Sequence, residues 1–523
     1  MRAISIVLVG LAVALAVAAA PPYRPTPDWI SGDTQVSTGA ALADLNRDGW
    51  LDLVVANGND MAEQRIVVYY NKGDGTFPAL PNWQSADIAY HGHLDVADVN
   101  GDGWIDVGVA TLGNGSKFGP VAKVYLNNSG TLSSLPNWKS AEIAPAFGIA
   151  FGDVNNDGRP DIAVATGWSY GTPHQYYNYV YVNQNGTYAP DASWRSDDKW
   201  DYQGALWVDA DGDGWLDLAE VGTRVNTKIY RNLGGTLETT ASWETKDAGN
   251  QDAIMACAGD VTGDGYRELF VADNSQLGGS GRFRQYNGLP GGFFSTAYNW
   301  SYLDGYCSAV ALADLNADGK LDLATGAWWD NTRVFLNAGT GLPTVPDWSS
   351  GGTSVVEKIA FGDIDKNAVY TTGAAFNAPG QHLFYLAKRP IQRLLAVRRN
   401  GVPLAPSQYT YSSEHGWITV APSDGVVEVE YRVSSRLDMA VTNWDNTKGN
   451  YVYYNILIKK GDANCDGVLN NFDIDPFVLI LTDPQTYKTL FPDCDGLKFC
   501  DMNGDGVVNN FDIDPFVYAL SNP

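Results

Sequence analysis

A nine-residue acidic motif, D-x-[DN]-x-D-G-x-x-D, recurs along most of the chain at intervals of 49 to 56 residues. Its first copy spans residues 44–52, and its seventh, incomplete copy begins at Asp363. Two markers keep the same count, because a tryptophan precedes each motif and a Val/Tyr-rich segment ending in asparagine follows it. Self-similarity at this period is typical of β-propellers, in which each repeat supplies one four-stranded blade. The sequence therefore predicts a mainly β protein with a seven-bladed propeller over residues 21–459.

Each repeat predicts four short strands, which in the first repeat include residues 39–45 before the acidic loop and 51–56 after it. Gly and Pro number 56 and 25 in 523 residues, a turn-rich composition that agrees with many short strands. The last repeat stops after Asn455 without an outer strand, whereas the segment around Trp29 is a spare one. We expect the N-terminal segment to complete the seventh blade, which would remove an exposed sheet edge.

These repeats resemble the FG-GAP/VCBS repeats of integrin-α-like propellers over roughly residues 25–459. The resemblance implies an extracellular binding scaffold, although relatives include carbohydrate-active enzymes. The seventh repeat departs from the pattern, because residues 369–435 are inserted inside its acidic loop before Asp438 resumes the motif. Alternating segments at 393–398, 416–420 and 426–431, with turn signals between them, predict a small β-sandwich-like module there.

The acidic loops have the residues of calcium sites. Positions 1, 3, 5 and 9 carry oxygen-bearing side chains, position 6 is Gly and position 7 can offer its backbone carbonyl, which suits a cation that takes six to eight oxygen ligands. We expect about six to seven Ca²⁺ ions in the propeller, with a structural role. The alternative is that the loops are only Asx-rich turns. The predicted ligands are Asp44, Asn46, Asp48, Trp50 and Asp52; Asp98, Asn100, Asp102, Trp104 and Asp106; Asp153, Asn155, Asp157, Arg159 and Asp161; Asp209, Asp211, Asp213, Trp215 and Asp217; Asp260, Thr262, Asp264, Tyr266 and Glu268; Asp314, Asn316, Asp318, Lys320 and Asp322; and Asp363, Asp365, Asn367 and Asp438.

The charge of the chain supports a bound cation. Its 60 acidic and 34 basic residues give a formal net charge of −26, which argues against a nucleic-acid partner. Twenty-two carboxylates lie in the propeller loops and six in the C-terminal loops, so removing these 28 would change −26 to +2. The acidic excess thus sits at predicted ligand positions, where like charges repel without a cation.

Two further loops near the C-terminus follow a different pattern, with oxygen side chains at positions 1, 3, 5, 9 and 12 and a helix-like apolar run after each. This is the EF-hand loop pattern with Asp at position 12, and we expect two Ca²⁺ ions here. The predicted ligands are Asp462, Asn464, Asp466, Val468, Asn470 and Asp473 in the first loop, and Asp501, Asn503, Asp505, Val507, Asn509 and Asp512 in the second.

Residues 461–523 resemble a type I dockerin, a small α EF-hand-like domain that docks secreted proteins onto cohesins. The resemblance implies a cohesin-like or other docking partner. In that family, positions 10 and 11 of each loop help select the partner, and by position these are Asn471 and Phe472, with Asn510 and Phe511 in the second loop. An aromatic residue at position 11 differs from the small polar residues of well-known cellulosomal dockerins. The alternative is that both phenylalanines are core residues.

Residues 1–20 combine Arg2, an apolar stretch and three alanines, which predicts a secretory signal peptide and a secreted or cell-surface protein. An uncleaved membrane anchor is the alternative, and no later apolar run is long enough to span a membrane. The five cysteines permit one disulfide between Cys257 and Cys307 and another within the group of Cys465, Cys494 and Cys500.

No catalytic residue is predicted, since the sequence contains no HExxH, GxSxG or phosphate-binding glycine loop. The pair His91 and His93 has no visible third ligand and is expected to be incidental. One group of aromatic residues does suggest a ligand face, because the loops after the second strands of three blades emerge opposite the acidic loops, and exposed indole and phenol rings stack on sugars. These residues are Trp168, Tyr170, Trp328, Trp329 and Trp444, and the alternative is that they fill gaps between blades.

Together these features predict a secreted calcium-binding propeller that acts as a carbohydrate- or protein-binding or adhesion component and is tethered through its C-terminal module. A polysaccharide is the expected ligand class. The alternative function is a carbohydrate-active enzyme, either a polysaccharide lyase or a glycoside hydrolase, because paired carboxylates outside the loops are not visible in a sequence.

Overall fold

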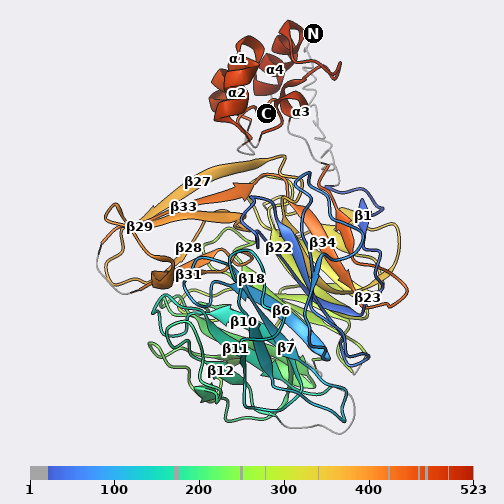
Figure 1. Ribbon diagram of the computed structural model, residues 1–523, viewed down its shortest axis with the longest axis vertical. Coiled ribbons are helices and arrows are strands. Elements are labelled where there is room, and N and C mark those ends of the chain that lie inside the picture. Colours follow the sequence, from blue (N-terminus) through green and yellow to red (C-terminus); the bar gives the residue numbers. More distant parts are fainter. Residues whose placement is uncertain are drawn as a thin grey trace, which may run out of the picture.

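The computed structural model describes residues 22–169, 176–247, 251–276, 278–339, 341–421, 425–456, 460–465, 469–492 and 494–521. The predicted signal peptide lies outside these residues, as do Tyr170, Asp466 and Val468. The described chain is mainly β and consists largely of repeated antiparallel sets of four strands, in a propeller-like arrangement, with a helical module at its C-terminal end (Figure 1).

Five of the sheets each take four consecutive strands of one sequence repeat. They are β2 (Ser37–Ala43), β3 (Asp52–Asn57), β4 (Val67–Tyr69) and β5 (Trp83–Gln84); β6 (His91–Ala97), β7 (Asp106–Thr111), β8 (Ala122–Tyr125) and β9 (Trp138–Lys139); β10 (Ala146–Gly152), β11 (Asp161–Thr166), β12 (Tyr179–Tyr181) and β13 (Trp194–Arg195); β14 (Asp201–Val208), β15 (Asp217–Thr223), β16 (Val225–Tyr230) and β17 (Trp243–Glu244); and β18 (Ala253–Gly259), β19 (Glu268–Asp273), β20 (Arg282–Tyr286) and β21 (Trp300–Leu303).

An eight-stranded sheet contains two further sets, joined by pairing between β23 and β26. One set is β22 (Cys307–Ala313), β23 (Asp322–Asp330), β24 (Arg333–Phe335) and β25 (Trp348–Ser349), and the other is β26 (Ser354–Gly362), β34 (Asp438–Asn443), β35 (Tyr451–Tyr453) and β1 (Trp29–Ile30). In the second set Trp29 lies opposite Val452, so the N-terminal strand pairs with the last strand of the repeat region. This is the position expected for the spare outer strand.

The first strands of the sets pack against one another. The strands β2, β6, β10, β14, β18, β22 and β26 each contact the next in this order, and β26 also contacts β2. Such close packing needs small residues, as Gly148 of β10 shows, because a Cβ at this position would lie 2.6 Å from the carbonyl oxygen of Gln203. The second strands of the first three repeats are buried along their whole length, in agreement with their nearly continuous apolar sequences.

The repeat tryptophans connect neighbouring sets. Trp194 packs edge-to-face on Tyr230, with ring centroids 5.4 Å apart, and its Nε1 donates a hydrogen bond to the carbonyl oxygen of Leu237 in the next repeat. Trp83, Trp243 and Trp300 also donate to carbonyl oxygens of the next repeat. A residue that makes the same contacts in several sets stabilises the sheets, so these tryptophans have the structural role that their recurrence indicates.

The insert of the seventh repeat consists of two small sheets that pack face to face. One sheet is β27 (Val369–Phe376), β33 (Val427–Ser434), β29 (Arg393–Arg399) and β30 (Val402–Pro403), and the other is β28 (Leu383–Tyr385), β32 (Trp417–Val420) and β31 (Tyr409–Tyr411), with a 3₁₀ turn at η1 (Pro406–Gln408). Apolar side chains of both sheets, such as Phe384 and Val429, form its core. Three of its seven strands, β29, β32 and β33, coincide closely with the predicted alternating segments.

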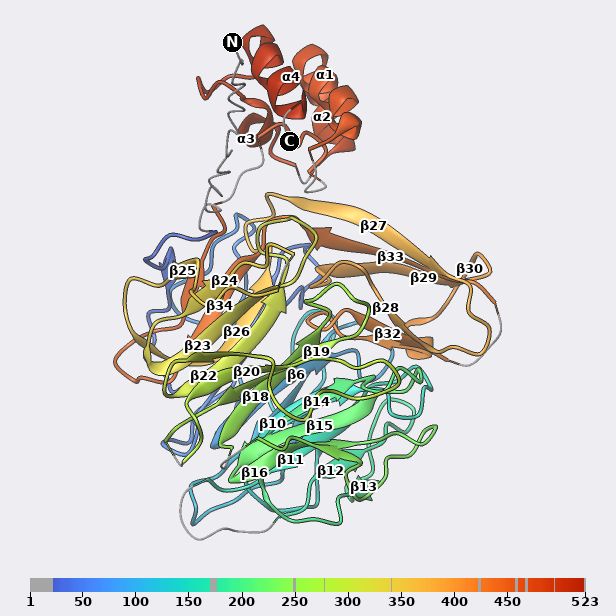
Figure 2. The ribbon, with the colours of Figure 1, turned by 180° about the vertical axis from the view of Figure 1, so that it is seen from behind.

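The C-terminal module is helical and lies beyond the β27–β33 edge of the insert in both ribbon views (Figures 1 and 2). It contains η2 (Asn471–Asp473), α1 (Ile474–Thr482), α2 (Pro484–Leu490), α3 (Gly496–Cys500), η3 (Asn510–Asp512) and α4 (Ile513–Ser521). Phe477 of α1 stacks on Phe516 of α4 with ring centroids 3.9 Å apart, and a disulfide joins Cys465 to Cys494. Cys257 and Cys307 are free and buried, so the second possible disulfide is not formed. In the described part of the chain, every helix is too short or too polar to cross a bilayer.

Candidate metal centres and ligand-binding face

Each acidic loop is a tight turn between the first and second strands of its repeat. In the second repeat the N–H of Gly103 donates to Asp98 Oδ2 at 2.6 Å, and the N–H of Trp104 donates to Asp102 Oδ1 at 2.8 Å. Position 6 has a positive φ between 82° and 90° in all six intact loops, a conformation that glycine adopts most readily. The carboxylates are thereby held at the inside of the turn, as the calcium interpretation requires.

The acidic residue at position 9 ties the ends of the strands together. Asp106 Oδ2 accepts a hydrogen bond from the N–H of Val99, at position 2 of its own loop, while Asp106 Oδ1 accepts from the N–H of Asn127. The contact with position 2 is repeated in all seven loops. Position 9 therefore has a structural role that does not depend on a metal.

The repeat asparagines link each loop to the loop of the preceding repeat. Asn232 Nδ2 donates to the carbonyl oxygen of Leu216 in its own repeat and to that of Val154 in the preceding one, at 3.0 and 2.7 Å. The contacts between repeats run from Asn71, Asn127, Asn183, Asn232, Asn337 and Asn455 to the carbonyl oxygens of Ile364, Leu45, Val99, Val154, Val261 and Leu315, respectively. We call this series the asparagine ladder; the sequence showed its members as markers but not their role.

The fifth repeat interrupts the asparagine ladder. There the position-9 residue is Glu268, whose Oε2 accepts from the N–H groups of Val261 and Thr262. The bond to the preceding repeat is made by the backbone N–H of Phe293, which donates to the carbonyl oxygen of Ala210 at 2.9 Å. The longer Glu side chain and Thr262 at position 3 make this loop the least regular of the six intact ones.

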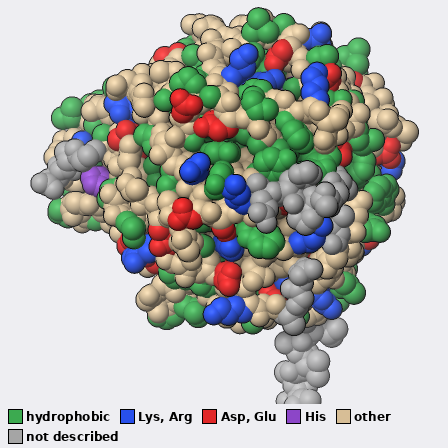
Figure 3. All heavy atoms as spheres, turned by 90° about the horizontal axis from the view of Figure 1, so that it is seen from below, with side chains coloured by type: hydrophobic (Ala, Val, Ile, Leu, Met, Phe, Trp, Pro, Cys, Tyr) green, Lys and Arg blue, Asp and Glu red, His purple; other side chains and the backbone are tan. Residues whose placement is uncertain are grey.

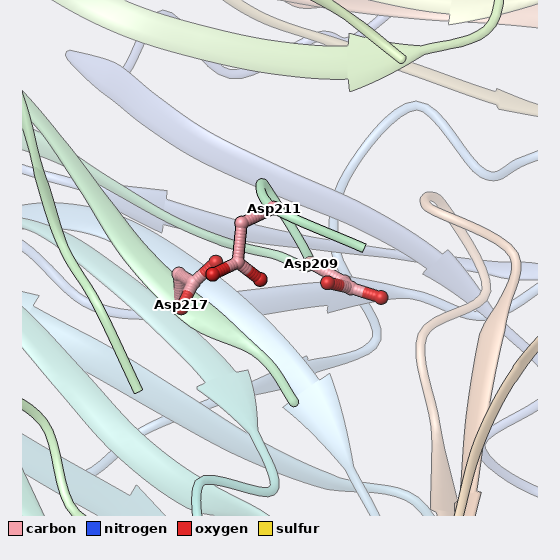
Figure 4. A group of neighbouring side chains, drawn as sticks. All are labelled: Asp209, Asp211 and Asp217. Atoms are coloured by element: carbon pink, nitrogen blue, oxygen red, sulfur yellow. The ribbon is translucent and has the colours of Figure 1, made fainter. Parts of the chain in front are cut away.

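Two loops bring three carboxylates within 4.8 Å of one another. The first group is Asp209, Asp211 and Asp217 of the fourth repeat, which lie close together in the turn (Figure 4). This loop has an additional acid at position 3, and Arg231 Nε lies 2.5 Å from Asp211 Oδ2. The basic side chain compensates the extra charge, so the loop keeps about the same net charge as its neighbours.

The second group is Asp363, Asp365 and Asp438 of the seventh repeat. Although 67 residues are inserted between positions 6 and 9, Asp438 returns to the loop, and its Oδ2 accepts from the N–H of Ile364 at 2.7 Å. The N–H of Ala368 donates to Asp363 Oδ2, as the glycine N–H does in the other loops. The structure therefore brings together the three acids that the damaged motif separates in sequence.

The loops contain donor atoms that fit a hard cation. Asp44 Oδ1, Asp365 Oδ1 and Asn367 Oδ1 are buried and accept no hydrogen bond within the described residues. Burial also raises the pKa of Asp52 to about 7 and the pKa values of Asp106, Asp217 and Asp322 to about 8, so a nearby positive charge would favour the ionised form of these carboxyl groups at neutral pH. A calcium ion would supply that charge and use the orphaned oxygens.

The predicted ligand face is only partly exposed. Trp168 and Trp328 are buried, each with 8% of its surface accessible, so the expectation that they are exposed platforms is wrong: they pack against Leu112, Phe147 and Ile254 near the centre of the propeller. Trp329 is 52% exposed, and its ring contacts both Trp444 and Tyr306 edge-to-face. Trp329 and Trp444 are thus the accessible part of the predicted face, while Tyr170 lies outside the described residues.

Charges elsewhere on the surface are mixed. Seen from below, acidic and basic side chains are intermingled with hydrophobic and other side chains over the part of that face drawn in colour (Figure 3). His91 and His93 are both buried on β6, and His91 Nδ1 lies 3.0 Å from the carbonyl oxygen of Asn57. The excess negative charge is therefore not spread over this face, as expected if it is concentrated in the acidic loops.

The two C-terminal loops repeat one geometry. Asp512 accepts from the N–H groups of Asn503 and Asn509, and Asp473 accepts from those of Asn464 and Asn470. These bonds fold each loop around its position-12 carboxylate. Asp466 and Val468 of the first loop lie outside the described residues.

The two phenylalanines of the C-terminal module lie on its surface. Phe472 and Phe511 are each 79% exposed, so the alternative that they are core residues is wrong. In the same two loop–helix units, Val478 of α1 and Val517 of α4 are also exposed. The module therefore presents two related apolar patches, one at each loop–helix unit.

Comparisons with known proteins identify the repeats. A model of the FG-GAP-like repeat matches residues 44–109, 109–164 and 260–325, and a model of the FG-GAP repeat matches residues 146–183. Among solved structures, Sqt1 of Saccharomyces cerevisiae is 9% identical, with 82% of this chain and 100% of that chain covered and a TM-score of 0.42. The computationally designed protein Ika8 is 12% identical, with 83% and 99% covered and a TM-score of 0.40. No curated protein matches the chain.

The chain thus contains FG-GAP repeats in a propeller-like β architecture, which confirms that part of the sequence prediction. Repeats of this kind are typical of extracellular or cell-surface proteins.

Proposed function

We propose that the protein is an exported, calcium-stabilised propeller of seven blades that binds a polysaccharide and is tethered to a partner by its C-terminal dockerin-like module. The seven sequence repeats and the contacts from each first strand to the next, including β26 to β2, support a closed ring. The asparagine ladder supports it further, since Asn71 of the first repeat donates to Ile364 of the seventh. Export rests on the predicted signal peptide.

The single observation that carries the binding role is the aromatic group formed by Trp328, Trp329, Trp444 and Tyr306. Their rings contact one another edge-to-face with centroids 5.6 to 6.1 Å apart, and Trp329 remains half exposed. Because the buried Trp328 fixes its neighbours, the exposed ring is held in one orientation. A rigid, exposed indole suits stacking on a sugar ring, which buries apolar C–H groups and leaves the hydroxyls free to hydrogen-bond.

The Trp329→Ala,Trp444→Ala variant should lose retention on polysaccharide. Affinity electrophoresis through gels containing soluble polysaccharides measures retention, and we expect at least a tenfold loss of affinity because a buried aromatic contact contributes about 1 to 3 kcal/mol. Tyr298→Ala is the control, because Tyr298 is also exposed but lies on the outer edge of the fifth repeat. Unchanged retention of the double variant on every polysaccharide that retains the native protein would refute the proposed face.

The tethering role makes a separate prediction. A partner that covers either apolar patch should bury Phe472 or Phe511, so Phe472→Ala,Phe511→Ala should weaken binding to a cohesin-like module by at least a hundredfold, while either single variant keeps one patch intact and loses less. Surface plasmon resonance against a panel of cohesins measures the affinities. Leu490→Ala is a suitable control, since Leu490 is exposed on α2 and lies in neither loop–helix unit. Equal binding of the native and double-variant proteins would contradict this assignment.

A further inference from the structure

We infer that the polysaccharide is a neutral one, and that hydroxyl groups of a sugar unit enter a pocket on the propeller axis and bridge Glu357 to Gln203. This inference rests on the proposed function, and it names both the ligand class and the residues that recognise the ligand. It concerns a different place from the exposed Trp329, since the pocket lies at the centre of the ligand face.

The pocket is built by the first strands of several repeats. Phe147 of β10, Gln203 of β14, Ile254 of β18 and Glu357 of β26 line it, together with the buried ring of Trp328. Because these strands surround the axis, the pocket is the mouth of the central channel. At the other end of the channel, residues of the insert, among them Tyr411 and Glu414, line a second pocket with the inner strands. The insert thus covers the acidic-loop end, and we place the ligand at the opposite mouth.

Two polar atoms in this pocket have no hydrogen-bond partner among the described residues. Glu357 is fully buried, and its Oε1 accepts a hydrogen bond from Trp328 Nε1 at 3.0 Å, but its Oε2 has no partner. Gln203 is 6% exposed, and its Nε2 also has no partner. Buried polar atoms are rarely left without hydrogen bonds, so the pair indicates a ligand that supplies them.

A hydroxyl group suits both orphaned atoms. Gln203 Nε2 can only donate, whereas Glu357 Oε2 accepts when ionised and can donate when protonated. A hydroxyl both donates and accepts, so neighbouring hydroxyls of one sugar unit satisfy the two residues in either protonation state of Glu357. The indole rings of Trp168 and Trp328, which also line the pocket, offer apolar surface to the C–H groups of the same unit.

The charge of the pocket excludes acidic sugars. Asp252 and Glu357 line it. The described lining residues include no Lys or Arg. A uronate or a sulfate ester in this position would bring a negative charge into an acidic, desolvated site without a compensating cation. Discrimination against acidic polysaccharides follows from this repulsion.

Affinity electrophoresis of the mature protein, in calcium, tests the inference with three neutral polysaccharides (galactomannan, xyloglucan and mixed-linkage β-glucan) and two acidic ones (polygalacturonate and alginate). We expect retention by at least one neutral polysaccharide and by neither acidic one. Gln203→Leu and Glu357→Gln should each reduce the affinity about tenfold, because each removes or alters one hydrogen bond in a desolvated site. Gln285→Leu is the matched control, since Gln285 is also buried but lies on β20 outside the pocket.

The outcomes separate the pocket from the proposed function. Retention by acidic polysaccharides only would overturn the inference and leave the binding function intact. Retention by a neutral polysaccharide that is lost in Trp329→Ala,Trp444→Ala but unchanged in both pocket variants would place the ligand on the exposed rings and overturn the pocket. If Gln203→Leu lowers the unfolding temperature, its loss of affinity no longer tests the pocket. The affinity of Glu357→Gln, which keeps an acceptor for Trp328, then provides the test. Absence of retention on all five polysaccharides would overturn the proposed function together with the inference.

Discussion

Removing calcium with a chelator should lower the unfolding temperature of the protein by about 10 °C or more at neutral pH. A ligand that binds only the folded state at about a hundred times its dissociation constant stabilises that state by about 2.7 kcal/mol per site, and several sites act together here. Without the ion, the clustered carboxylates of loops such as 209–217 repel one another, and buried oxygens such as Asp44 Oδ1 lose their ligand. Differential scanning calorimetry with and without chelator measures the shift.

Two comparisons show whether this shift comes from the acidic loops. Asp98→Ala removes a position-1 ligand and should both destabilise the protein and reduce its response to calcium. Asp74→Ala is the matched control, because Asp74 is an exposed carboxylate that caps a turn through Thr76 and lies outside the loops. Adding Ca²⁺ back should restore the unfolding temperature, whereas Mg²⁺ should not, because Mg²⁺ demands a tighter octahedral site. An unfolding temperature that does not change when calcium is chelated would refute the structural role of the ion.

Asn232→Ala should destabilise the protein by about 3 kcal/mol, because it removes both side-chain donors from two buried carbonyl oxygens, those of Val154 and Leu216. It also removes Oδ1, which accepts hydrogen bonds from the N–H groups of Gly234 and Gly235. The shift in the midpoint of urea-induced unfolding, at saturating calcium, measures the loss of stability.

The fifth repeat provides the control for the asparagine ladder. Asn287 occupies the same place in its repeat as Asn232 does, but the bond to the preceding repeat comes from the backbone N–H of Phe293. Asn287→Ala should therefore cost less than about 1 kcal/mol. Equal destabilisation by the two variants would show that the asparagine ladder does not hold neighbouring repeats together.

The repeat period, the acidic loops and the insert were predictable from the sequence because each is a local pattern. A motif with glycine at position 6 specifies a tight turn wherever it occurs, and alternating residues such as those at 426–431 specify a strand. The markers also predicted which segments are equivalent. The role of the repeat asparagines was not predictable, because most connect their own loop to that of another repeat about 75 to 85 residues away. Asn455 reaches 140 residues back across the insert, and Asn71 reaches the other end of the repeat region.

The axial pocket could not be predicted for the same physical reason. Gln203 and Glu357 come from different repeats, and only the packing of the first strands brings them to one pocket. The exposure of the aromatic residues also could not be predicted from the sequence, since Trp328 and Trp329 are neighbours in the chain but Trp328 is buried and Trp329 is half exposed. The exposure of Phe472 and Phe511 could not be predicted either. An apolar residue next to a helix suggests a core position until the packing of α1 against α4 is known.

Counting the calcium ions bound to the mature protein tests the account most directly, because the proposed closed ring and its stability are expected to depend on the acidic loops being metal sites. Native mass spectrometry of the protein, dialysed against calcium and then against a chelator, gives the count. We predict six to seven ions released from the propeller and two from the C-terminal module, with the Asp98→Ala variant holding one ion fewer. A protein that retains no calcium, or that binds only the two ions of the C-terminal module, would contradict the account.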